Sequence, residues 1–273
     1  MNSDRGNEAT RDAILLEICV DSVDSALAAQ QGGAHRIELC SSLIEGGVTP
    51  SAGLISIVRN LVSIDLYAMI RPRSGDFCYS DEELDVMQHD IKVAKQIGAN
   101  GIVFGILDHE GKVDVDRCRR LVDAARPLKV TFHRAFDMSR DLNQSLEEII
   151  RAGVDRVLTS GAHEKVERGL SKLKRLNRAA ANRIAVMAGG GITERNVRRI
   201  IEETGVHEIH ASVRVPISSP MRHRNEKVAM GNLKSREYQR IVVAEEKVRR
   251  LLAAASDALK GQRPILAWPI KKP

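Results

Sequence analysis

Aromatic side chains are scarce in this sequence of 273 residues, where they make up only 3%, whereas hydrophobic residues of all kinds make up 43%. The buried core must therefore be built mainly from aliphatic side chains. No stretch is long and apolar enough for a membrane-spanning helix. The polar first ten residues also lack the apolar segment of a signal peptide. We therefore expect a cytoplasmic protein that makes no contact with a membrane.

The chain also lacks paired cysteines. Its four cysteines are Cys19, Cys40, Cys78 and Cys118, and no two of them form a CxxC motif. Cysteines that are spread out in this way stay unbridged in a reducing compartment. Their spacing does not match that of a structural zinc site either.

The positive net charge of +6 comes without any basic run interleaved with aromatic residues. Nucleic acid is therefore not an expected partner. Most of the excess lies in the C-terminal third of the chain. It has two interpretations, which are a solvated basic surface and a pocket for a small anionic molecule.

The sequence does contain a repeated pattern in which a short apolar strand is followed by a helix. Strands are predicted at 15–20, 36–40, 65–71, 101–107, within 129–138, and at 156–160, 183–188 and 208–213. The helices behind them are predicted at 23–31, 51–61, 81–97, 114–125, 143–152, 165–181, 194–203 and about 235–259. Short apolar runs are typical of a parallel sheet that helices cover.

Eight strand–helix units in a chain of this length predict an α/β fold, a single (β/α)8 TIM barrel. A doubly wound open sheet usually has fewer strands and a glycine-rich first turn, but the turn at 19–22 contains no glycine. Three similar segments, each a helix end followed by glycine and a new strand, support the repeated unit. The expected organisation is a disordered N-terminal segment at 1–12, the barrel at 13–260 and a C-terminal tail at 261–273.

Polar and sulfur-containing side chains follow most of the predicted strands. In this fold, function gathers at the carboxyl ends of the strands. Ionisable groups such as His133, Arg134 and Asp137 cost free energy there unless they are paired. Because side chains alternate along a strand, shared faces are expected for Glu17 with Cys19, Glu38 with Cys40, Met69 with Arg71, Thr131 with His133, and His210 with Ser212.

Two interpretations of these residues remain open. They form either a self-neutralising ion-pair network that fixes the barrel or a functional pocket. We favour the pocket because many strands contribute at the same level. The same alternation turns Arg134 towards the helices, where it can pair with Asp137.

An anion site is predicted near the seventh strand. Gly189, Gly190 and Gly191 precede a predicted helix, and backbone N–H groups at a helix start favour anions. A plain tight turn would explain these glycines as well. The residues expected to bind an anion or substrate are Arg71, Arg73, Ser160, Gly189, Gly190, Gly191 and His210.

Cys19 and Cys40 occupy matching positions on adjacent predicted strands. Thiolates suit Cu(I), and imidazole or thioether groups can complete such a site. A buried cysteine can equally be a small apolar side chain. Because their positions match, the two cysteines support a metal site more strongly than a single thiol would.

Several motifs closely resemble those of the CutC family. They are EICVDS at 17–22, RIELC at 36–40, EGGVTP at 45–50, MIRPR at 69–73, TFHRAFD at 131–137, LTSG at 158–161, MAGGGI at 187–192 and IHAS at 209–212. The resemblance runs from about residue 15 to residue 259. It implies a cytoplasmic TIM barrel that acts in copper homeostasis, with Cys19 and Cys40 as copper ligands. Two departures from the family pattern are Ala188, in place of proline, and the segment 213–220.

Two functions are therefore predicted. The first is copper homeostasis, with Cu(I) bound by Cys19 and Cys40. The second is an enzyme acting on a small anionic or carbohydrate-like substrate, with Glu38 or His133 as general acid or base and Glu17 tuning the pocket. The expected partners are a metal ion or a small anionic molecule, and we expect a homodimer or a higher homo-oligomer. Converging thiols would favour the metal function, whereas a carboxylate, an imidazole and an arginine around a cavity would favour catalysis.

Overall fold

The computed structural model describes residues 13–225, 227–228, 230 and 237–260. The predicted segments at 1–12 and 261–273 lie outside the described residues. β1 to β8 close into a barrel in which each strand is parallel to its neighbours. The predicted (β/α)8 barrel is confirmed.

The barrel strands are short and follow the predicted order. They are β1 (Leu15–Val20), β2 (Arg36–Leu39), β3 (Asp65–Met69), β4 (Gly101–Phe104), β5 (Lys129–Phe132), β6 (Arg156–Thr159), β7 (Ala185–Ala188) and β8 (Glu208–Ala211). Most predicted strands extended one to three residues too far, into the polar loops at their carboxyl ends. Those loops carry the side chains of the candidate site.

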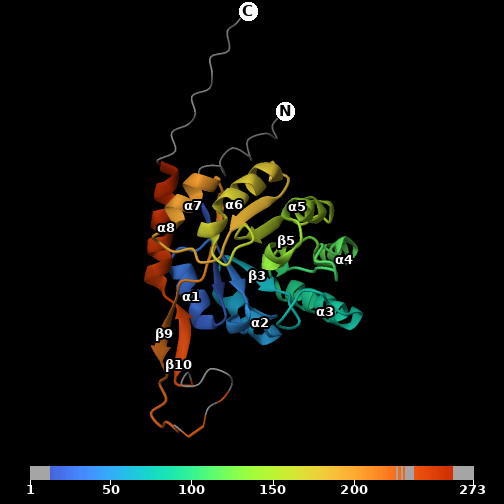
Figure 1. The fold of residues 1–273 in the computed structure, drawn as a ribbon. Helices are drawn as coiled ribbons and strands as arrows, with labels where there is room; N and C mark the ends of the chain where they lie inside the picture. Colours follow the sequence, from blue (N-terminus) through green and yellow to red (C-terminus); the bar gives the residue numbers. More distant parts are fainter. Residues whose placement is uncertain (1–12, 226, 229, 231–236, 261–273) are drawn as a thin grey trace, which may run out of the picture.

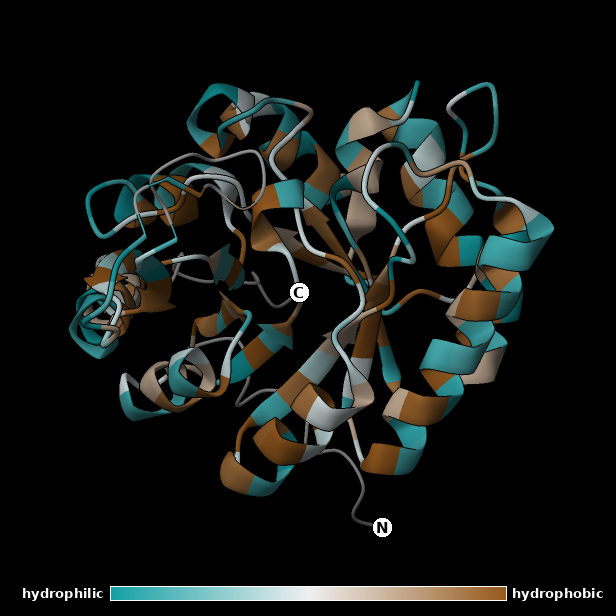
Figure 2. Ribbon diagram, turned by 90° about the horizontal axis from the view of Figure 1, so that it is seen from below, coloured by the Kyte–Doolittle hydropathy of each residue, from teal (hydrophilic) through white to brown (hydrophobic). Residues whose placement is uncertain are grey.

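Helices surround the barrel, as Figures 1 and 2 show. They are α1 (Val23–Gln31), α2 (Ala52–Leu61), α3 (Asp81–Ile97), α4 (Val115–Ala125), α5 (Leu142–Arg151), α6 (Val166–Ala180), α7 (Val197–Thr204) and α8 (Glu245–Lys260), with short 3-10 turns η1 (Leu43–Glu45) and η2 (Arg134–Met138). Among the residues that the structure describes, no helix is both long and apolar enough to cross a membrane.

Alternation along the strands separates an apolar layer from the lumen. In β1, Leu16, Ile18 and Val20 are fully buried in the main hydrophobic core beneath the helices. Glu17 and Cys19 alternate with them and lie on the opposite, lumen-facing side of the strand. The aliphatic core expected from the composition is therefore wrapped around a lumen that contains charged groups.

An antiparallel hairpin follows β8, where the sequence predicted a longer eighth strand and then a long helix. β9 (Arg214–Ser218) pairs with β10 (Gln239–Val243), and Figure 1 shows the hairpin projecting from the barrel. The predicted start of the last helix near residue 235 is therefore wrong, because α8 begins at Glu245.

The last residues of β10 explain this difference. Ile241, Val242 and Val243 are β-branched and favour a strand. The backbone N–H of Val243 donates to Ser25 Oγ on α1 at 3.1 Å, and Arg240 pairs with Asp24 of the same helix at 2.6 Å. Pairing with β9 and packing on α1 outweigh the helical pattern that continues into α8.

Candidate functional site

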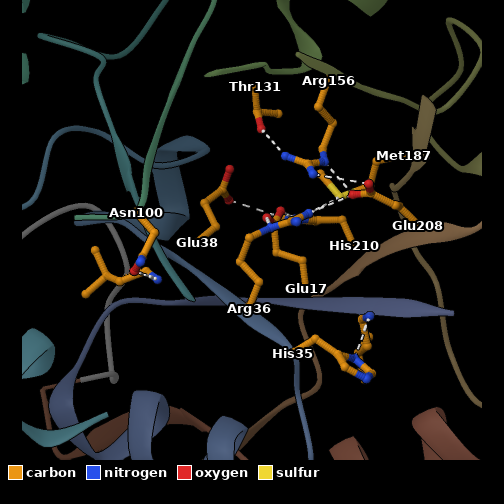
Figure 3. Close-up of polar contacts among 12 residues, drawn as sticks. Glu17, His35, Arg36, Glu38, Asn100, Thr131, Arg156, Met187, Glu208 and His210 are labelled. Carbon is orange, nitrogen blue, oxygen red and sulfur yellow. Dashed lines mark hydrogen bonds and ion pairs between the residues drawn. The ribbon is translucent and has the colours of Figure 1, made fainter. Parts of the chain in front are cut away.

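The lower part of the lumen, near the amino ends of the strands, holds a buried network of ion pairs (Figure 3). The Arg36 guanidinium donates through Nε to Glu17 and through a terminal nitrogen to Glu208 at 2.9 Å. Arg156 donates to both oxygens of Glu208 and also contacts Thr131 Oγ1 at 3.3 Å. Glu17 is fully buried and Arg36 is 1% exposed. The ion-pair interpretation therefore describes this layer of the barrel.

The charges in this layer hold one another ionised. Burial alone would raise the pKa of Glu17, but Arg36 and His210 outweigh burial and keep it far below its usual range. Arg156 and Arg36 likewise lower the pKa of Glu208 against the effect of burial. Both carboxylates are therefore charged at neutral pH.

His210 on β8 connects this network to the upper lumen. Its Nδ1 lies 2.8 Å from Glu17 Oε1, and its Nε2 lies 3.7 Å from Glu38 Oε2. Burial would lower the pKa of His210, but contacts with Glu38, Cys19 and Glu17 raise it well above its usual value. The imidazole is therefore protonated and places a positive charge beneath the thiols.

Above His210, the two predicted cysteine ligands converge. Cys19 Sγ and Cys40 Sγ lie 3.9 Å apart, and Cys40 Sγ lies 3.7 Å from Glu38 Oε2. The thiol of Cys40, together with the charge on His210, lowers the pKa of Cys19 to about 5. The hydrogen bond to Cys19 and burial raise the pKa of Cys40. The pair thus holds one thiolate and one thiol at neutral pH.

The donor atoms at this position fit a soft metal ion. One ligand atom each from Cys19, Glu38 and Cys40 lies within 4.8 Å of the others. Metal–sulfur bonds of about 2.3 Å, the length found for zinc, allow two ligating sulfurs to be at most ~4.6 Å apart. The observed separation of the cysteine sulfurs meets this limit, and both thiols are free.

A pocket of about 370 Å³ opens above these residues at the carboxyl ends of the strands. Its lining includes Cys19, Glu38, Arg71, His133, Arg134 and His210. The lining also includes Met69 and Ser212, as the alternation predicted. The structure therefore brings together most of the side chains expected at this end of the barrel, while Glu17 lies deeper and contacts His210.

Three residues of this pocket carry a buried polar atom without a hydrogen-bond partner in the described chain. These atoms are Glu38 Oε1, Arg71 Nε and His133 Nε2. An unpaired buried polar atom costs free energy, so native proteins rarely leave several in one place. Their grouping marks this pocket as the candidate site for a polar ligand.

Arg71 carries a buried positive charge, and its terminal nitrogens are hydrogen-bonded to backbone carbonyl groups. Its terminal nitrogens donate to the carbonyl oxygens of Glu45, Gly47 and Gly75 at 2.8–2.9 Å. No carboxylate of the described residues lies within ion-pair distance of it. The guanidinium also stacks over Phe77, 5.1 Å from the ring centre. Arg71 therefore makes the pocket electropositive at this wall.

His133 is held as a neutral imidazole. Its Nδ1 accepts a hydrogen bond from the backbone N–H of Ala135 at 3.1 Å, so its proton resides on Nε2. Burial and the charge of Arg71 lower the pKa of His133 to about 3. A group with this pKa is a weak base at neutral pH, so His133 suits a hydrogen-bond donor better than a general base.

Arg73 and Ser160 do not line the pocket. Arg73 turns outwards and pairs with Glu83 at 2.5 Å and with Asp76 at 3.1 Å. Ser160 is fully buried, and its hydroxyl contacts Asp137 at 2.9 Å.

The glycine turn lies outside the pocket lining as well. A side chain at Gly189 would meet Leu158, and one at Gly190 would press on Ser160, so close packing explains both positions. α7 begins only at Val197, several residues beyond the predicted start. The turn therefore does not place a helix N-terminus at Gly191, and the anion site expected there stays a prediction without this support.

Arg134 departs from the expected orientation. It pairs with Asp137 at 2.8 Å, as predicted, and donates to Ser160 Oγ at 2.7 Å. Yet it also lines the pocket, so the expectation that it points only towards the helices is wrong. The 3-10 turn η2 causes this, because strand alternation ends at Phe132.

Arg36 and Arg156 are the residues of the lumen network that the sequence prediction missed. Both lie at the amino ends of their strands, whereas function in this fold is expected at the carboxyl ends. The signal was available, because Arg36 precedes Glu38 by two residues and so shares its face.

The fold and the site define a (β/α)8-barrel protein with a combined thiol and carboxylate centre at the carboxyl end of its barrel. Residues 14–215 match the model of the CutC family. The chain belongs to the CutC family.

Relatives across the family support this assignment. The human protein named copper homeostasis protein cutC homolog is 49% identical over 255 residues, which cover 93% of each chain. A CutC of Bacteroides fragilis is 45% identical over 90% of this chain and 98% of its own length. The crystal structure of a CutC from Streptococcus agalactiae superposes with a TM-score of 0.70 at 34% identity, over 72% of this chain and 97% of that one.

Proposed function

We propose that this chain is a copper homeostasis protein that binds Cu(I) through Cys19 and Cys40. The observation that carries the proposal is the 3.9 Å separation of the two sulfur atoms, of which Cys19 lines the open pocket and Cys40 lies fully buried next to it. Thiolates select Cu(I) over harder ions, and the low pKa of Cys19 supplies a thiolate at neutral pH. The names of the human and mouse relatives point to the same role.

The compartment and the assembly belong to the same proposal. Cu(I) binding needs reduced thiols, and a reducing cytoplasm keeps cysteines in that state. All four cysteines are free in the structure, which agrees with such a compartment. The expected homodimer or higher homo-oligomer stays a prediction that sedimentation equilibrium can test.

A competition titration with a chromophoric Cu(I) chelator tests copper binding. The Cys19→Ser/Cys40→Ser double variant should hold one Cu(I) per chain fewer than the wild type, because serine hydroxyls are poor ligands for this ion. Cys118→Ala is the matched control, since Cys118 lies on α4 and is buried in the hydrophobic core. An unchanged stoichiometry in the double variant would refute the proposal.

A second candidate function is catalysis in the same pocket on a small anionic or carbohydrate-like substrate. Burial, followed by the charge on Cys19, raises the pKa of Glu38 well above its usual value. A carboxyl at the pocket wall whose pKa is raised in this way can act as a general acid. The unpartnered atoms of Glu38, Arg71 and His133 favour this reading, with His133 donating a hydrogen bond to the substrate.

Crystals soaked with a broad set of small metabolites would test this second candidate. A bound metabolite in the pocket, turned over by the wild type and not by Glu38→Gln, is the expected result. Amide for carboxyl keeps the size of the side chain and removes its proton transfer. An empty pocket across the whole set would remove the support for catalysis without affecting the copper proposal.

A further inference from the structure

Soft donor groups also gather in a groove beside the pocket. Cys78 Sγ lies 3.5 Å from the His109 Nδ1 atom. Both residues line a groove of about 800 Å³ that Met138 also lines. A thiol, an imidazole and a thioether therefore share one groove outside the barrel lumen.

Backbone hydrogen bonds hold the three loops that carry these residues. The N–H of Leu107 donates to the carbonyl oxygen of Phe77 at 2.8 Å, which joins the loop after β3 to the loop after β4. The N–H of Arg140 donates to the carbonyl oxygen of Gly111 at 2.8 Å, which joins the loop after β4 to the end of η2. The fold itself thus places Cys78, His109 and Met138 along one groove.

One oxygen of Asp76 and one of Asp108 in this groove are hydrogen-bonded within the loops. Asp76 Oδ1 accepts hydrogen bonds from Arg73 and from the backbone N–H of Cys78, both at 3.1 Å. Asp108 Oδ1 accepts from the backbone N–H groups of Glu110 and Lys112 at 2.9 and 2.8 Å. These oxygens support the turns, and the thiol, the imidazole and the thioether are the soft donors that the groove offers to a metal ion.

The groove is far more accessible than the buried thiol pair. Met138 is 70% exposed and His109 is also exposed, while Cys78 is half-buried. Cys40, by contrast, is fully buried. The groove and the pocket share Phe77 and Arg134 as lining residues, so the two are adjacent.

We propose that Cys78, His109 and Met138 form a second, exposed binding site for Cu(I), at which the ion is held before it enters the pocket. Thiolate, imidazole and thioether groups are the ligands that suit this ion. Binding replaces the S–H bond of Cys78 with an S–Cu bond and releases the thiol proton to solvent, with no change in oxidation state. The idea rests on the proposed copper function, but it concerns residues that the buried pair does not include.

A set of variants in the Cys19→Ser/Cys40→Ser background isolates this second site. The background protein should keep one Cu(I) per chain in a chelator competition. Adding Cys78→Ser should abolish that equivalent. Adding His109→Ala should weaken it at least about tenfold, since even an outer-shell metal contact carries that much, and Met138→Leu should weaken it less.

Two matched controls lie elsewhere on the surface. His89→Ala removes an exposed histidine of α3, and Met221→Leu changes a methionine that is 56% exposed. Neither should change the stoichiometry. Copper X-ray absorption of the background protein should show both sulfur and nitrogen neighbours, and the nitrogen contribution should vanish with His109→Ala.

Three outcomes would overturn the second site. They are a background protein that binds no Cu(I), an equivalent that survives Cys78→Ser, and alkylation of Cys78 by iodoacetamide that Cu(I) does not slow. The last result would make Cys78 and His109 a reactive thiol–imidazole pair that binds no metal. Failure of the buried site is seen separately, as an unchanged stoichiometry when only Cys19 and Cys40 are replaced.

Discussion

Glu17 joins the two layers of the lumen through its two oxygens. Oε2 accepts from Arg36 in the lower network, and Oε1 faces His210 beneath the thiols at 2.8 Å. A fully buried carboxylate in this position is compensated from both sides. It thereby fixes the orientation of His210, whose charge stabilises the thiolate of Cys19.

We predict that Glu17→Gln lowers the free energy of unfolding by about 3–5 kcal/mol, because it breaks a buried ion pair and leaves Arg36 with Glu208 as its remaining charge partner. Urea denaturation measures the loss. Glu147→Gln is the control, since this carboxylate pairs with Arg183 at the surface, and it should change stability little. Equal effects of the two substitutions would contradict the account.

His133 should make the protein sensitive to acid. Its folded pKa is about 3, whereas an unfolded histidine titrates near ~6.5. Between these values the unfolded chain binds a proton that the folded chain does not, so stability falls as pH decreases, by up to about 1.4 kcal/mol per pH unit.

The measurement is the urea midpoint from pH 7 to pH 4. His133→Gln cannot take up this proton, so its stability should fall less steeply than that of the wild type. His89→Gln, at an exposed position, should keep the wild-type slope. Parallel curves for the wild type and His133→Gln would show that the imidazole is not held neutral.

Strand alternation was enough to predict much of the site. It placed Cys19, Glu38 and His210 in the lumen, where the structure has them. It failed for Arg134, which lies beyond the end of a strand, where the side-chain period of two no longer holds. Arg73, an expected anion-binding residue, also lies beyond a strand end and turns outwards. Their directions depend on the partners Asp137 and Glu83, which no local pattern reveals.

At the scale of elements, the start of α3 shows how a loop of the site is anchored. Ser80 Oγ accepts from the N–H of Glu83 at 3.2 Å, and Glu83 Oε2 accepts from the N–H of Ser80 at 2.9 Å. This capping box satisfies the free N–H groups of the helix start. Glu83 also binds Arg73, so the cap supports the loop that carries Cys78.

Ser80→Ala should therefore cost about 1 kcal/mol of stability, the usual loss for an N-cap hydroxyl. Chemical denaturation gives this value. Ser171→Ala on the exposed surface of α6 is the control and should be neutral or slightly stabilising, because alanine favours a helix. A Ser80→Ala variant as stable as the wild type would mean that the cap contributes nothing.

The order and type of the barrel elements were predictable because each unit carries its own signals. α1 and α3 have the predicted bounds, set by a capping serine before each helix and a glycine after it. The hairpin of β9 and β10 was missed because its strands are stabilised by each other and by α1. Such contacts between distant segments leave no periodic pattern in the sequence.

At the scale of the whole molecule, the lumen is layered from one end to the other. Arginine–carboxylate pairs fill the lower part, and the protonated His210 lies in the middle. Cys19 lies at the base of the open pocket, with the buried Cys40 next to it. The lower layer stabilises the barrel, and in the proposed function the upper layer presents a thiolate to an entering ion. One column of side chains in the lumen thus serves both the stability of the barrel and the proposed function.

Copper X-ray absorption of the Cys78→Ser variant, loaded with one equivalent of Cu(I), tests the central claim most directly. With the outer site removed, the ion should lie between Cys19 and Cys40, and the spectrum should show sulfur as the nearest neighbour. A nearest shell of nitrogen or oxygen alone, or a failure of the variant to retain the ion, would contradict the account.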